Sequence, residues 1–194
     1  RHAPEMPSAE SRKETGPQTF ALGDATPDFQ QSVERWNREG HCARLWDADA
    51  SLWTGSDEDR WLGWLDAIRS SQGELPALQA LAESVRQDAI HDVVVMGMGG
   101  SSLCPDVLAR TFAPTAGWPR LHVLDSTVPA QIQRLRDAID LSSSLFIVPS
   151  KSGTTIEPNS FQRRFFSDVE AALPGVQAGS RFIAITDPGS PLDE

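Results

Sequence analysis

Four short apolar runs stand out in the second half of the chain, at residues 93–96, 121–124, 145–148 and 182–185. Nearly continuous apolar runs of this length are typical of strands that are buried on both faces of a parallel sheet. The segments between the runs carry apolar residues at helical spacing: Leu103, Val107 and Leu108, then Ile132, Leu135 and Ile139, then Phe161, Phe165, Val169 and Leu173. This alternation predicts an α/β fold with a three-layer, doubly wound parallel sheet.

The first half of the chain has a different pattern. Residues 1–26 are rich in Pro, Ser, Glu and Arg and lack periodicity, which is typical of a flexible linker. Residues 27–90 are predicted to form a helical N-terminal segment, and residues 91–194 the α/β domain. Three helical faces are expected, carried by Phe29, Val33 and Trp36, by Trp61, Leu62, Trp64, Leu65 and Ile68 behind caps at Ser56 and Asp57, and by Leu75, Leu78, Leu81, Ala82 and Val85.

Two further features concern how the chain completes its packing. The sequence stops just beyond the fourth apolar run, where the pattern demands another helix, so the sheet is expected to be incomplete in this chain. Five of the six tryptophans fall between residues 36 and 64. They could form a platform on which a sugar stacks, but large aromatic residues on helices more often bind a neighbouring domain or the body of their own domain, and we favour that interpretation.

Composition and charge narrow the choice of partners. The net charge of −10 disfavours nucleic acid and anionic membrane surfaces, because both attract positively charged proteins. No apolar run approaches the roughly 20 residues that are needed to cross a bilayer. The two cysteines, Cys42 and Cys104, have no metal-ligand spacing. They predict free thiols in a reducing cytoplasm and no metal site.

Candidate chemistry lies in the loops that follow the predicted strands. In a doubly wound sheet, ligands bind beyond the carboxyl ends of the strands, near the point where the strand order reverses. That rule selects four loops, at residues 97–102, 125–129, 150–158 and 186–190.

The most informative of these loops reads SKSGTTIEP, at residues 150–158. A phosphate favours hydroxyl and N–H groups at the start of a helix, where the helix dipole adds to the attraction. Gly153 lets the backbone approach a ligand, Lys151 adds a positive charge, and Glu157 could either cap the helix or contact the ligand. A capped turn needs one hydroxyl, whereas this loop has four: Ser150, Ser152, Thr154 and Thr155. We therefore predict a phosphate cradle here.

The loop GMGGSS at residues 97–102 admits a second interpretation. Its glycines resemble the dinucleotide fingerprint G-x-G-x-x-G, but Ser102 stands in place of the third glycine. The acidic candidate for the ribose, Asp125, lies 28 residues after Gly97 rather than about 20. A serine after two glycines suits a sugar hydroxyl or a phosphate oxygen better, so a nucleotide-binding Rossmann domain is the weaker alternative.

Together, GMGGSSL and SKSGTTIEP resemble the two signature loops of the sugar isomerase (SIS) domain. They are most similar to those of the phosphoglucose isomerase family, which read G-x-G-G-S-x-L-G-P and S-K-T-x-T-T-x-E-T. The flanking stretches RLWDADASLW, WLGWL, LHVLDSTVPAQI and FIAITDPGSPL resemble the version that is fused behind a transaldolase. The chain departs from the family pattern at Cys104, which replaces a glycine, and at Ser152 and Gly153, where many members carry Thr and a bulky residue.

The resemblance implies roles for individual residues. It implies that the sugar lies against the first loop, at Gly99, Gly100 and Ser101. It implies that the phosphate is held by the second loop through nearby amides and side chains, namely Ser150, Ser152, Thr154 or Thr155, with Lys151 and Gly153 adjacent.

The resemblance also implies a reaction, the interconversion of glucose 6-phosphate and fructose 6-phosphate without a metal or organic cofactor. A carboxylate base moves a proton between C1 and C2 in that family. The catalytic glutamate, arginine and histidine of the family lie beyond the end of this sequence, so this chain alone is expected to bind a sugar phosphate without turning it over. The implied partners are the remainder of the isomerase chain, a fused transaldolase and a second subunit. The alternative is a non-catalytic SIS module that senses a phosphosugar and regulates a partner.

Overall fold

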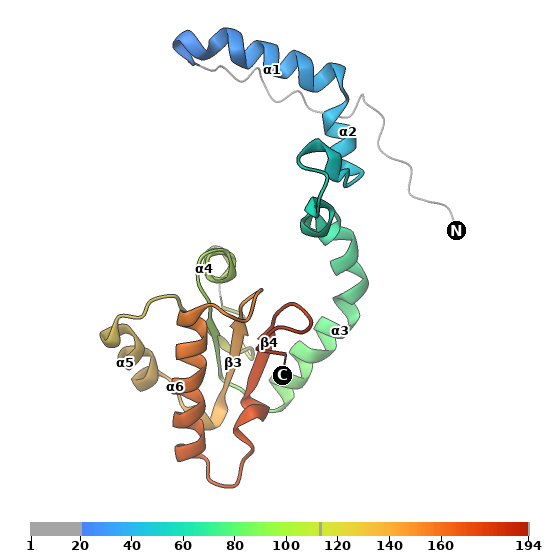
Figure 1. The fold of residues 1–194 in the computed structure, drawn as a ribbon. Coiled ribbons are helices and arrows are strands. Elements are labelled where there is room, and N and C mark those ends of the chain that lie inside the picture. Colours follow the sequence, from blue (N-terminus) through green and yellow to red (C-terminus); the bar gives the residue numbers. More distant parts are fainter. Residues whose placement is uncertain (1–20, 113, 194) are drawn as a thin grey trace. The chain divides into compact units, whose positions relative to one another are not determined.

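The structure is a computed structural model that describes residues 21–112 and 114–193 (Figure 1). The chain divides into two compact units, Arg1–Gly73 and Glu74–Glu194. This division falls inside the segment 27–90 that the sequence groups together, because the second half of one long helix belongs with the sheet. Most of the predicted linker, residues 1–20, lies outside the described residues.

The first unit is helical in its described part. It contains η2 (Gly23–Ala25), α1 (Thr26–Arg38), α2 (His41–Trp46), η3 (Ala50–Leu52), η4 (Glu58–Trp61), η5 (Gly63–Asp66) and the beginning of α3 (Ala67–Gln87). The prediction of one apolar helix over residues 61–68 is therefore wrong, since η4 and η5 are short 3-10 turns that precede α3. The Glu58 carboxylate explains the tight turn, because it accepts the backbone N–H groups of Thr54 at 2.8 Å and Ser56 at 3.0 Å. The Asp57 side chain makes no cap hydrogen bond.

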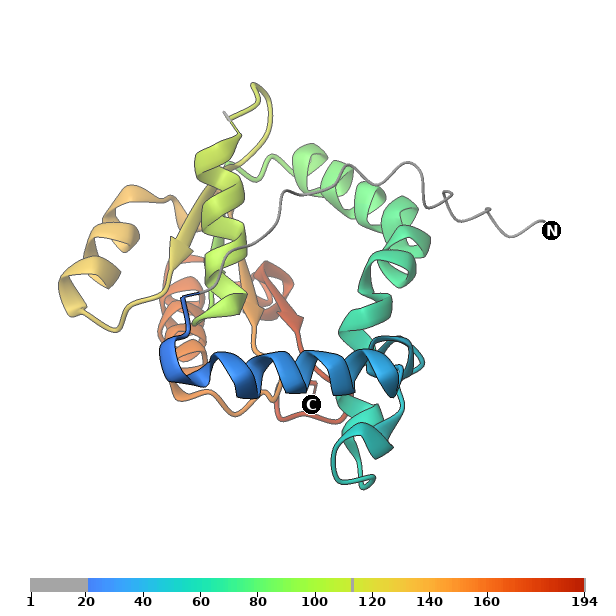
Figure 2. The same cartoon turned by 90° about the horizontal axis from the view of Figure 1, so that it is seen from above.

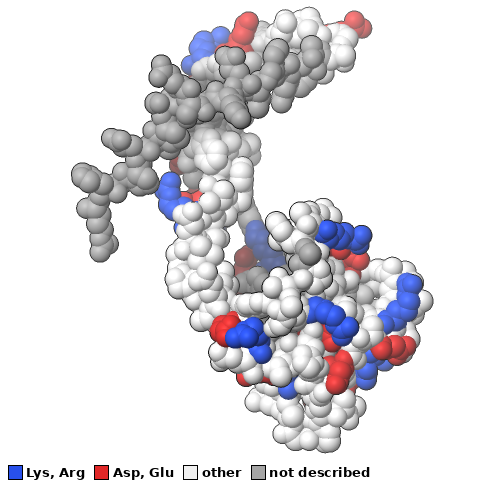
Figure 3. All heavy atoms as spheres, turned by 180° about the vertical axis from the view of Figure 1, so that it is seen from behind, with Lys and Arg blue, Asp and Glu red and all other residues white. Residues whose placement is uncertain are grey.

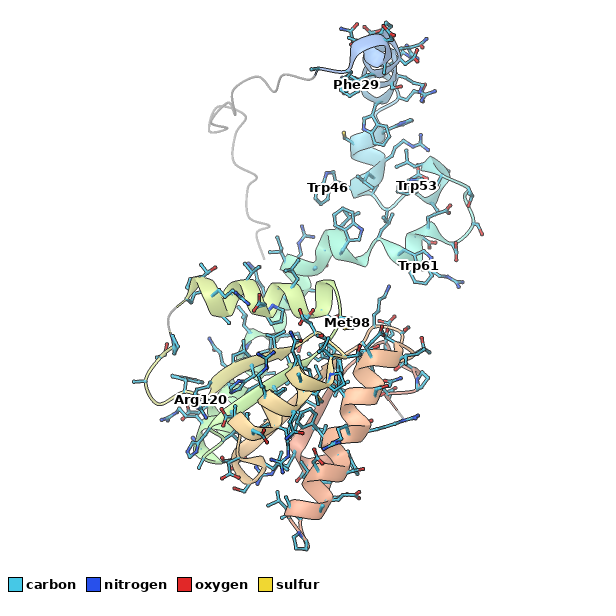
Figure 4. All side chains as sticks on the ribbon, turned by 90° about the vertical axis from the view of Figure 1, so that its left-hand side faces the viewer. Phe29, Trp46, Trp53, Trp61, Met98 and Arg120 are labelled. Atoms are coloured by element: carbon cyan, nitrogen blue, oxygen red, sulfur yellow. The ribbon has the colours of Figure 1, made fainter. Side chains whose placement is uncertain are left out.

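The tryptophans of the first unit are exposed. No residue between 21 and 73 is buried, and Trp46, Trp61 and Trp64 expose 65%, 59% and 63% of their surface. Figure 4 labels Trp46, Trp53 and Trp61 on this unit. A cavity of about 410 Å³ is lined in part by Trp53 and Trp61. The choice between a sugar platform and a docking surface stays a prediction.

The second unit contains the predicted parallel sheet. Its strands are β1 (Asp92–Met96), β2 (Arg120–Leu124), β3 (Ser144–Pro149) and β4 (Phe182–Ile185), which agree with the four apolar runs to within two residues. All three pairings are parallel, and the strand order is β2-β1-β3-β4. The prediction of a doubly wound α/β fold is confirmed. The helices that follow β1, β2 and β3 are α4 (Gly100–Thr111), α5 (Pro129–Ala138) and α6 (Ile156–Ala172).

One face of the sheet carries the main core. Alternate residues of the strands, including Val94 and Phe146, pack there against buried side chains of α6, and partly buried side chains of α5 lie at the margin. The Phe146 ring lies 5.1 Å from that of Phe165 and 4.9 Å from that of Phe182, measured between centroids. The fully buried members of this core on strands and helix are Val94, Met96, Phe146, Val148, Phe161, Phe165 and Val169.

The opposite face of the sheet is less completely covered. An apolar cavity of about 310 Å³ lies between this face and the second half of α3, and its lining includes Leu78, Val85, Leu145 and Ile147. The expectation that the strands are buried on both faces fails in the outermost strands of the sheet, where residues such as Ile185 are exposed. An edge strand lacks a neighbour on one side, so its side chains have fewer partners.

A buried carboxylate organises the amino-terminal edge of the sheet. Asp92, at the start of β1, is 1% exposed. It accepts hydrogen bonds from two nitrogens of Arg120, at 2.9 and 3.0 Å, and it lies 2.7 Å from Nε2 of His122. Burial opposes ionisation of Asp92, but the hydrogen bonds from Arg120 and His122 outweigh it, so its pKa lies below the usual 3.8. His122 is therefore a structural partner.

The surface charges, the cysteines and the helices can each be compared with what the composition predicts. On the face of the second unit seen in Figure 3, basic and acidic side chains alternate without forming a patch of one sign. Cys42 and Cys104 are both free, as predicted. Within the described residues, no helix combines the length and apolar character that a membrane span requires.

Candidate functional site

The two loops with candidate chemistry follow neighbouring strands. The strand that follows β1 in the chain, β2, lies on one side of it, whereas β3 and then β4 are added on the other side, so the direction in which strands are added reverses between β1 and β3. In a doubly wound sheet this reversal marks the ligand crevice. The loops at 97–102 and 150–158 leave the carboxyl ends of these two strands. Figure 2 shows the sheet and its helices from above, and Figure 4 labels Met98 in the first of the two loops.

Gly97 brings the two loops into contact. A Cβ atom at this position would lie 2.9 Å from Cγ of Pro149, which is closer than real contacts allow, and 3.1 Å from Cβ of Ser101, which is tighter than most real contacts. Pro149 directly precedes Ser150, so the absence of a side chain at Gly97 lets the start of α4 lie against the end of β3. The first glycine of the motif is thus required by packing between the loops.

The next two glycines line open space. Gly99 has a left-handed φ of +56°, which favours glycine, and it precedes the first residue of α4. No heavy atom lies within 4 Å of a Cβ built on Gly99 or on Gly100. Ser101 is partly exposed, whereas Ser102 is buried and donates its hydroxyl to the Gly99 carbonyl at 3.1 Å. A ligand can therefore approach the backbone at Gly99 and Gly100.

The second loop presents a buried hydroxyl. Ser150 is 4% exposed, and its Oγ has no hydrogen-bond partner among the described residues. A buried hydroxyl that no described protein group satisfies is a candidate to bind a ligand.

The other hydroxyls of this loop differ from one another. The Ser152 and Thr154 oxygens lie 2.8 Å apart, and the Thr154 N–H donates to Ser152 Oγ at 3.2 Å. These two side chains therefore organise the turn. Thr155 is partly exposed at the N-cap of α6 and makes no side-chain cap hydrogen bond, and Lys151 is exposed.

The start of α6 adds N–H groups to the loop. The first amides of a helix lack an acceptor inside the helix, and they carry the positive end of its dipole. In α6 these include the amides of Ile156 and Glu157, which follow Thr155 directly. Glu157 is partly exposed in the first turn, a position that suits an acidic residue. Pro158 has no N–H to contribute and is buried.

The sequence prediction did not assign roles to three residues that contact this loop: Asn159, Thr186 and Ser190. Asn159 Nδ2 donates to the Gly153 carbonyl at 3.0 Å, and Thr186 Oγ1 donates to the Lys151 carbonyl at 3.2 Å. A Cβ atom at Gly153, where φ is +65°, would lie 2.8 Å from Ser190 Oγ. The sequence signal for Thr186 and Ser190 was the position of loop 186–190 directly after a predicted strand.

The remaining predicted loop lies elsewhere at this edge. Residues 125–129 follow β2, which neighbours β1 on the side away from β3. A cavity of about 300 Å³ there is lined by both acidic and basic side chains, including Asp125 and Arg134. Among the described residues, no three His, Cys, Asp or Glu side chains gather as metal ligands would. The hydroxyls and free amides of the loops after β1 and β3 suit an anion.

Comparison with known proteins identifies the family. The sequence model of the phosphoglucose isomerase family matches residues 79–187. This segment holds the whole parallel sheet and both crevice loops. The chain belongs to the phosphoglucose isomerase family.

Individual relatives agree with this assignment. A glucose-6-phosphate isomerase of Chlamydia pneumoniae is 35% identical over 78% of this chain and 27% of its own length, and one from Nostoc sp. is 35% identical over 62% of this chain and 24% of its own. The crystal structure of a glucose-6-phosphate isomerase from Chlamydia trachomatis superposes with a TM-score of 0.57 at 30% identity, covering 67% of this chain and 25% of the other. A hypothetical protein from Thermus thermophilus, TT0462, gives 0.59 at 30% identity over 86% and 38%. This chain spans about a quarter of the length of these curated relatives.

Proposed function

We propose that this chain is the sugar-phosphate-binding part of a glucose-6-phosphate isomerase that interconverts glucose 6-phosphate and fructose 6-phosphate. The main support is the pairing of the start of α6 with the buried Ser150 hydroxyl, which no described residue satisfies, at the point where strand order reverses. Membership of the isomerase family supports the choice of substrate.

In the proposed complex, each loop has a separate task. The phosphate accepts hydrogen bonds from Ser150, Thr155 and the first amides of α6, while Ser152, Thr154 and Gly153 shape the turn around it. Lys151 contributes charge from the exposed side. The sugar lies over Gly99, Gly100 and Ser101, where no Cβ occupies the space. Glu157 stays a candidate for either ligand contact or helix stabilisation.

The proposal assigns binding, and not the proton transfer, to this chain. Isomerisation needs a base within hydrogen-bond distance of the carbon acid. The family resemblance places that base, with the arginine and the histidine, at positions outside this sequence. We therefore propose that the remainder of an isomerase supplies them, in a cytoplasmic enzyme without metal or organic cofactor. A fused transaldolase and a second subunit are further proposed partners. The resemblance of the flanking stretches supports the transaldolase, and the frequent dimerisation of the family supports the second subunit.

Calorimetry on the 194-residue chain tests this function. We expect fructose 6-phosphate and glucose 6-phosphate to bind, fructose to give no heat because it lacks the anion, and a coupled assay to detect no turnover. Circular dichroism verifies that the chain is folded. A folded chain that binds neither phosphosugar would refute the proposal. Isomerase activity at the level of a complete enzyme would refute the assignment of proton transfer to residues outside this chain.

A further inference from the structure

The turn at residues 150–155, which is proposed to bind the phosphate, has a feature that its hydroxyls do not explain. This feature is the direction of its carbonyl groups. A site for an anion must keep carbonyl oxygens away from the ligand, because their partial negative charge repels it, while N–H groups face it. Three acceptors of the turn matter here, the carbonyls of Ser150, Lys151 and Gly153. Each of them is occupied by a donor from the protein.

The donors come from three parts of the second unit. The Ser150 carbonyl accepts the N–H of Gly153 within the turn, at 3.0 Å. The Lys151 carbonyl accepts the N–H of Asp187 at 2.9 Å and the Thr186 hydroxyl at 3.2 Å, both from the loop after β4. The Gly153 carbonyl accepts Nδ2 of Asn159 at 3.0 Å, from α6.

Asn159 is the only one of these donors that belongs to the helix whose dipole would attract the phosphate. Its carboxamide orientation follows from chemistry, since the opposite flip would set Oδ1 against the Gly153 oxygen, acceptor against acceptor. Asn159 Oδ1 is buried and has no partner among the described residues. The bond to Gly153 is therefore the hydrogen bond by which this side chain fixes the position of the turn relative to α6.

The neighbourhood of Gly153 leaves the turn little freedom on its other side. Gly153 is buried with a left-handed φ, and Ser190 and the backbone of Leu192 pack against its Cα. Ser190 is itself held by Thr186, whose hydroxyl oxygen lies 2.6 Å from its own. The turn is thus clamped between loop 186–192 and the Asn159 side chain.

We propose that Asn159 is a positioning residue for anion binding: its carboxamide holds the Gly153 carbonyl away from the ligand, so that the Ser150 hydroxyl and the first amides of α6 face the phosphate. This inference rests on the proposed function of the same site. It extends that function to a residue that does not itself touch the ligand, and it predicts that the loss of Asn159 weakens the capture of the anion rather than recognition of the sugar.

The test compares Asn159→Ala and the isosteric Asn159→Asp with the unchanged chain, using calorimetry with fructose 6-phosphate and with inorganic phosphate. We expect Asn159→Ala to lower the affinity for both ligands by the same factor. A loss of about three- to tenfold corresponds to the loss of one hydrogen bond. Asn159→Asp should weaken them more, because a carboxylate repels both the Gly153 carbonyl and the anion. Ser160→Ala is the matched control on the same helix, since its exposed hydroxyl donates to the Ile156 carbonyl within α6.

A second readout separates positioning from general destabilisation. The ¹⁵N–¹H spectrum of the ligand-free chain should show shifted amides at Gly153 and Thr154 in Asn159→Ala, with the amides of β1 unchanged. Should Asn159→Ala fail to fold, Asn159→Asp carries the test. An unchanged chain that binds phosphosugar and an Asn159→Ala variant that binds it equally well would overturn this inference alone. A folded, unchanged chain that binds neither ligand would overturn the proposed function and this inference together.

Discussion

The amino-terminal and carboxyl edges of the parallel sheet make a useful comparison, because both carry buried polar groups and, among the described residues, the carboxyl edge leaves two polar atoms without a partner. At the amino-terminal edge, the Asp92 carboxylate is shared by Arg120 and His122, and the Ser144 hydroxyl donates to the Asp140 carbonyl at 2.6 Å. At the carboxyl edge, the oxygens of Ser150 and Asn159 are buried without partners in the described part of the chain. In Figure 4, Arg120 is labelled at the amino-terminal edge and Met98 at the carboxyl edge.

The difference separates polar groups that hold the fold from polar groups that are available to a ligand. A buried polar atom without a partner destabilises the folded state by about 1–3 kcal/mol. Such an atom is retained when something outside the chain completes it, whereas a paired atom needs nothing further. Variants at the two edges should therefore have opposite effects on stability and on binding.

The largest effect on stability is expected from Asp92→Ala. This change removes an acceptor that serves two side chains, and hydrogen bonds to charged groups contribute about 1.5–3 kcal/mol each. We expect the free energy of unfolding, measured with urea, to fall by about 2–4 kcal/mol, while the folded fraction keeps its affinity for fructose 6-phosphate. Asp106→Ala is the control, because its pair with Arg110 lies on the surface of α4 and should change stability by less than about 1 kcal/mol. Equal losses in both variants would mean that burial of Asp92 adds nothing.

A chemically identical substitution at each edge gives the sharpest contrast. Ser150→Ala should lower phosphosugar affinity by roughly tenfold or more, since it removes a charge-assisted hydrogen bond, and it should leave the unfolding midpoint unchanged or slightly higher. Ser144→Ala should lower stability by about 1 kcal/mol and leave affinity unchanged. Calorimetry and urea unfolding of the same two samples measure both quantities. Two variants with the same profile would remove the distinction between the edges.

The pH dependence of stability should report the amino edge alone. The pKa of Asp92 is lower in the folded chain than its ordinary 3.8. The stabilisation from ionised Asp92 is therefore complete above about pH 4, and it is lost as the pH falls through the folded-state value. We expect the difference in unfolding free energy between the unchanged chain and Asp92→Asn to be constant at neutral pH and to shrink below pH of about 4. A difference that stays constant on acidification would contradict this assignment.

The smallest effect is expected from Lys151→Ala. An exposed ammonium contributes about 0.2–1 kcal/mol to an ion pair, so phosphosugar affinity should fall by no more than about fivefold. The loss should diminish at high ionic strength because salt screens exposed charges. Arg181→Ala, which removes the same charge beside the start of β4, is the control and should bind normally. A loss of a hundredfold or more would instead make Lys151 a principal ligand.

Much of the second unit follows from local sequence. The four strands and three helices appear where the apolar pattern predicts them, because runs such as residues 93–96 and 145–148 can be buried only as central strands. The pattern misleads between residues 57 and 66, where η4 and η5 replace a helix. There the Glu58 carboxylate captures the amides of Thr54 and Ser56, a competition that hydrophobic spacing does not record.

The sequence by itself determined the fold class, the family and the two loops in which chemistry is concentrated, since strand burial, glycine placement and hydroxyl content are local properties. Only the tertiary structure decided which hydroxyls are available. Ser150 and Ser152 look alike in the loop, but Ser152 bonds within the turn, whereas the buried Ser150 hydroxyl has no partner in the described part of the chain. The contacts of Asn159, Thr186 and Ser190 with the turn likewise depend on where β3, β4 and α6 bring the chain together, which no spacing along the sequence specifies.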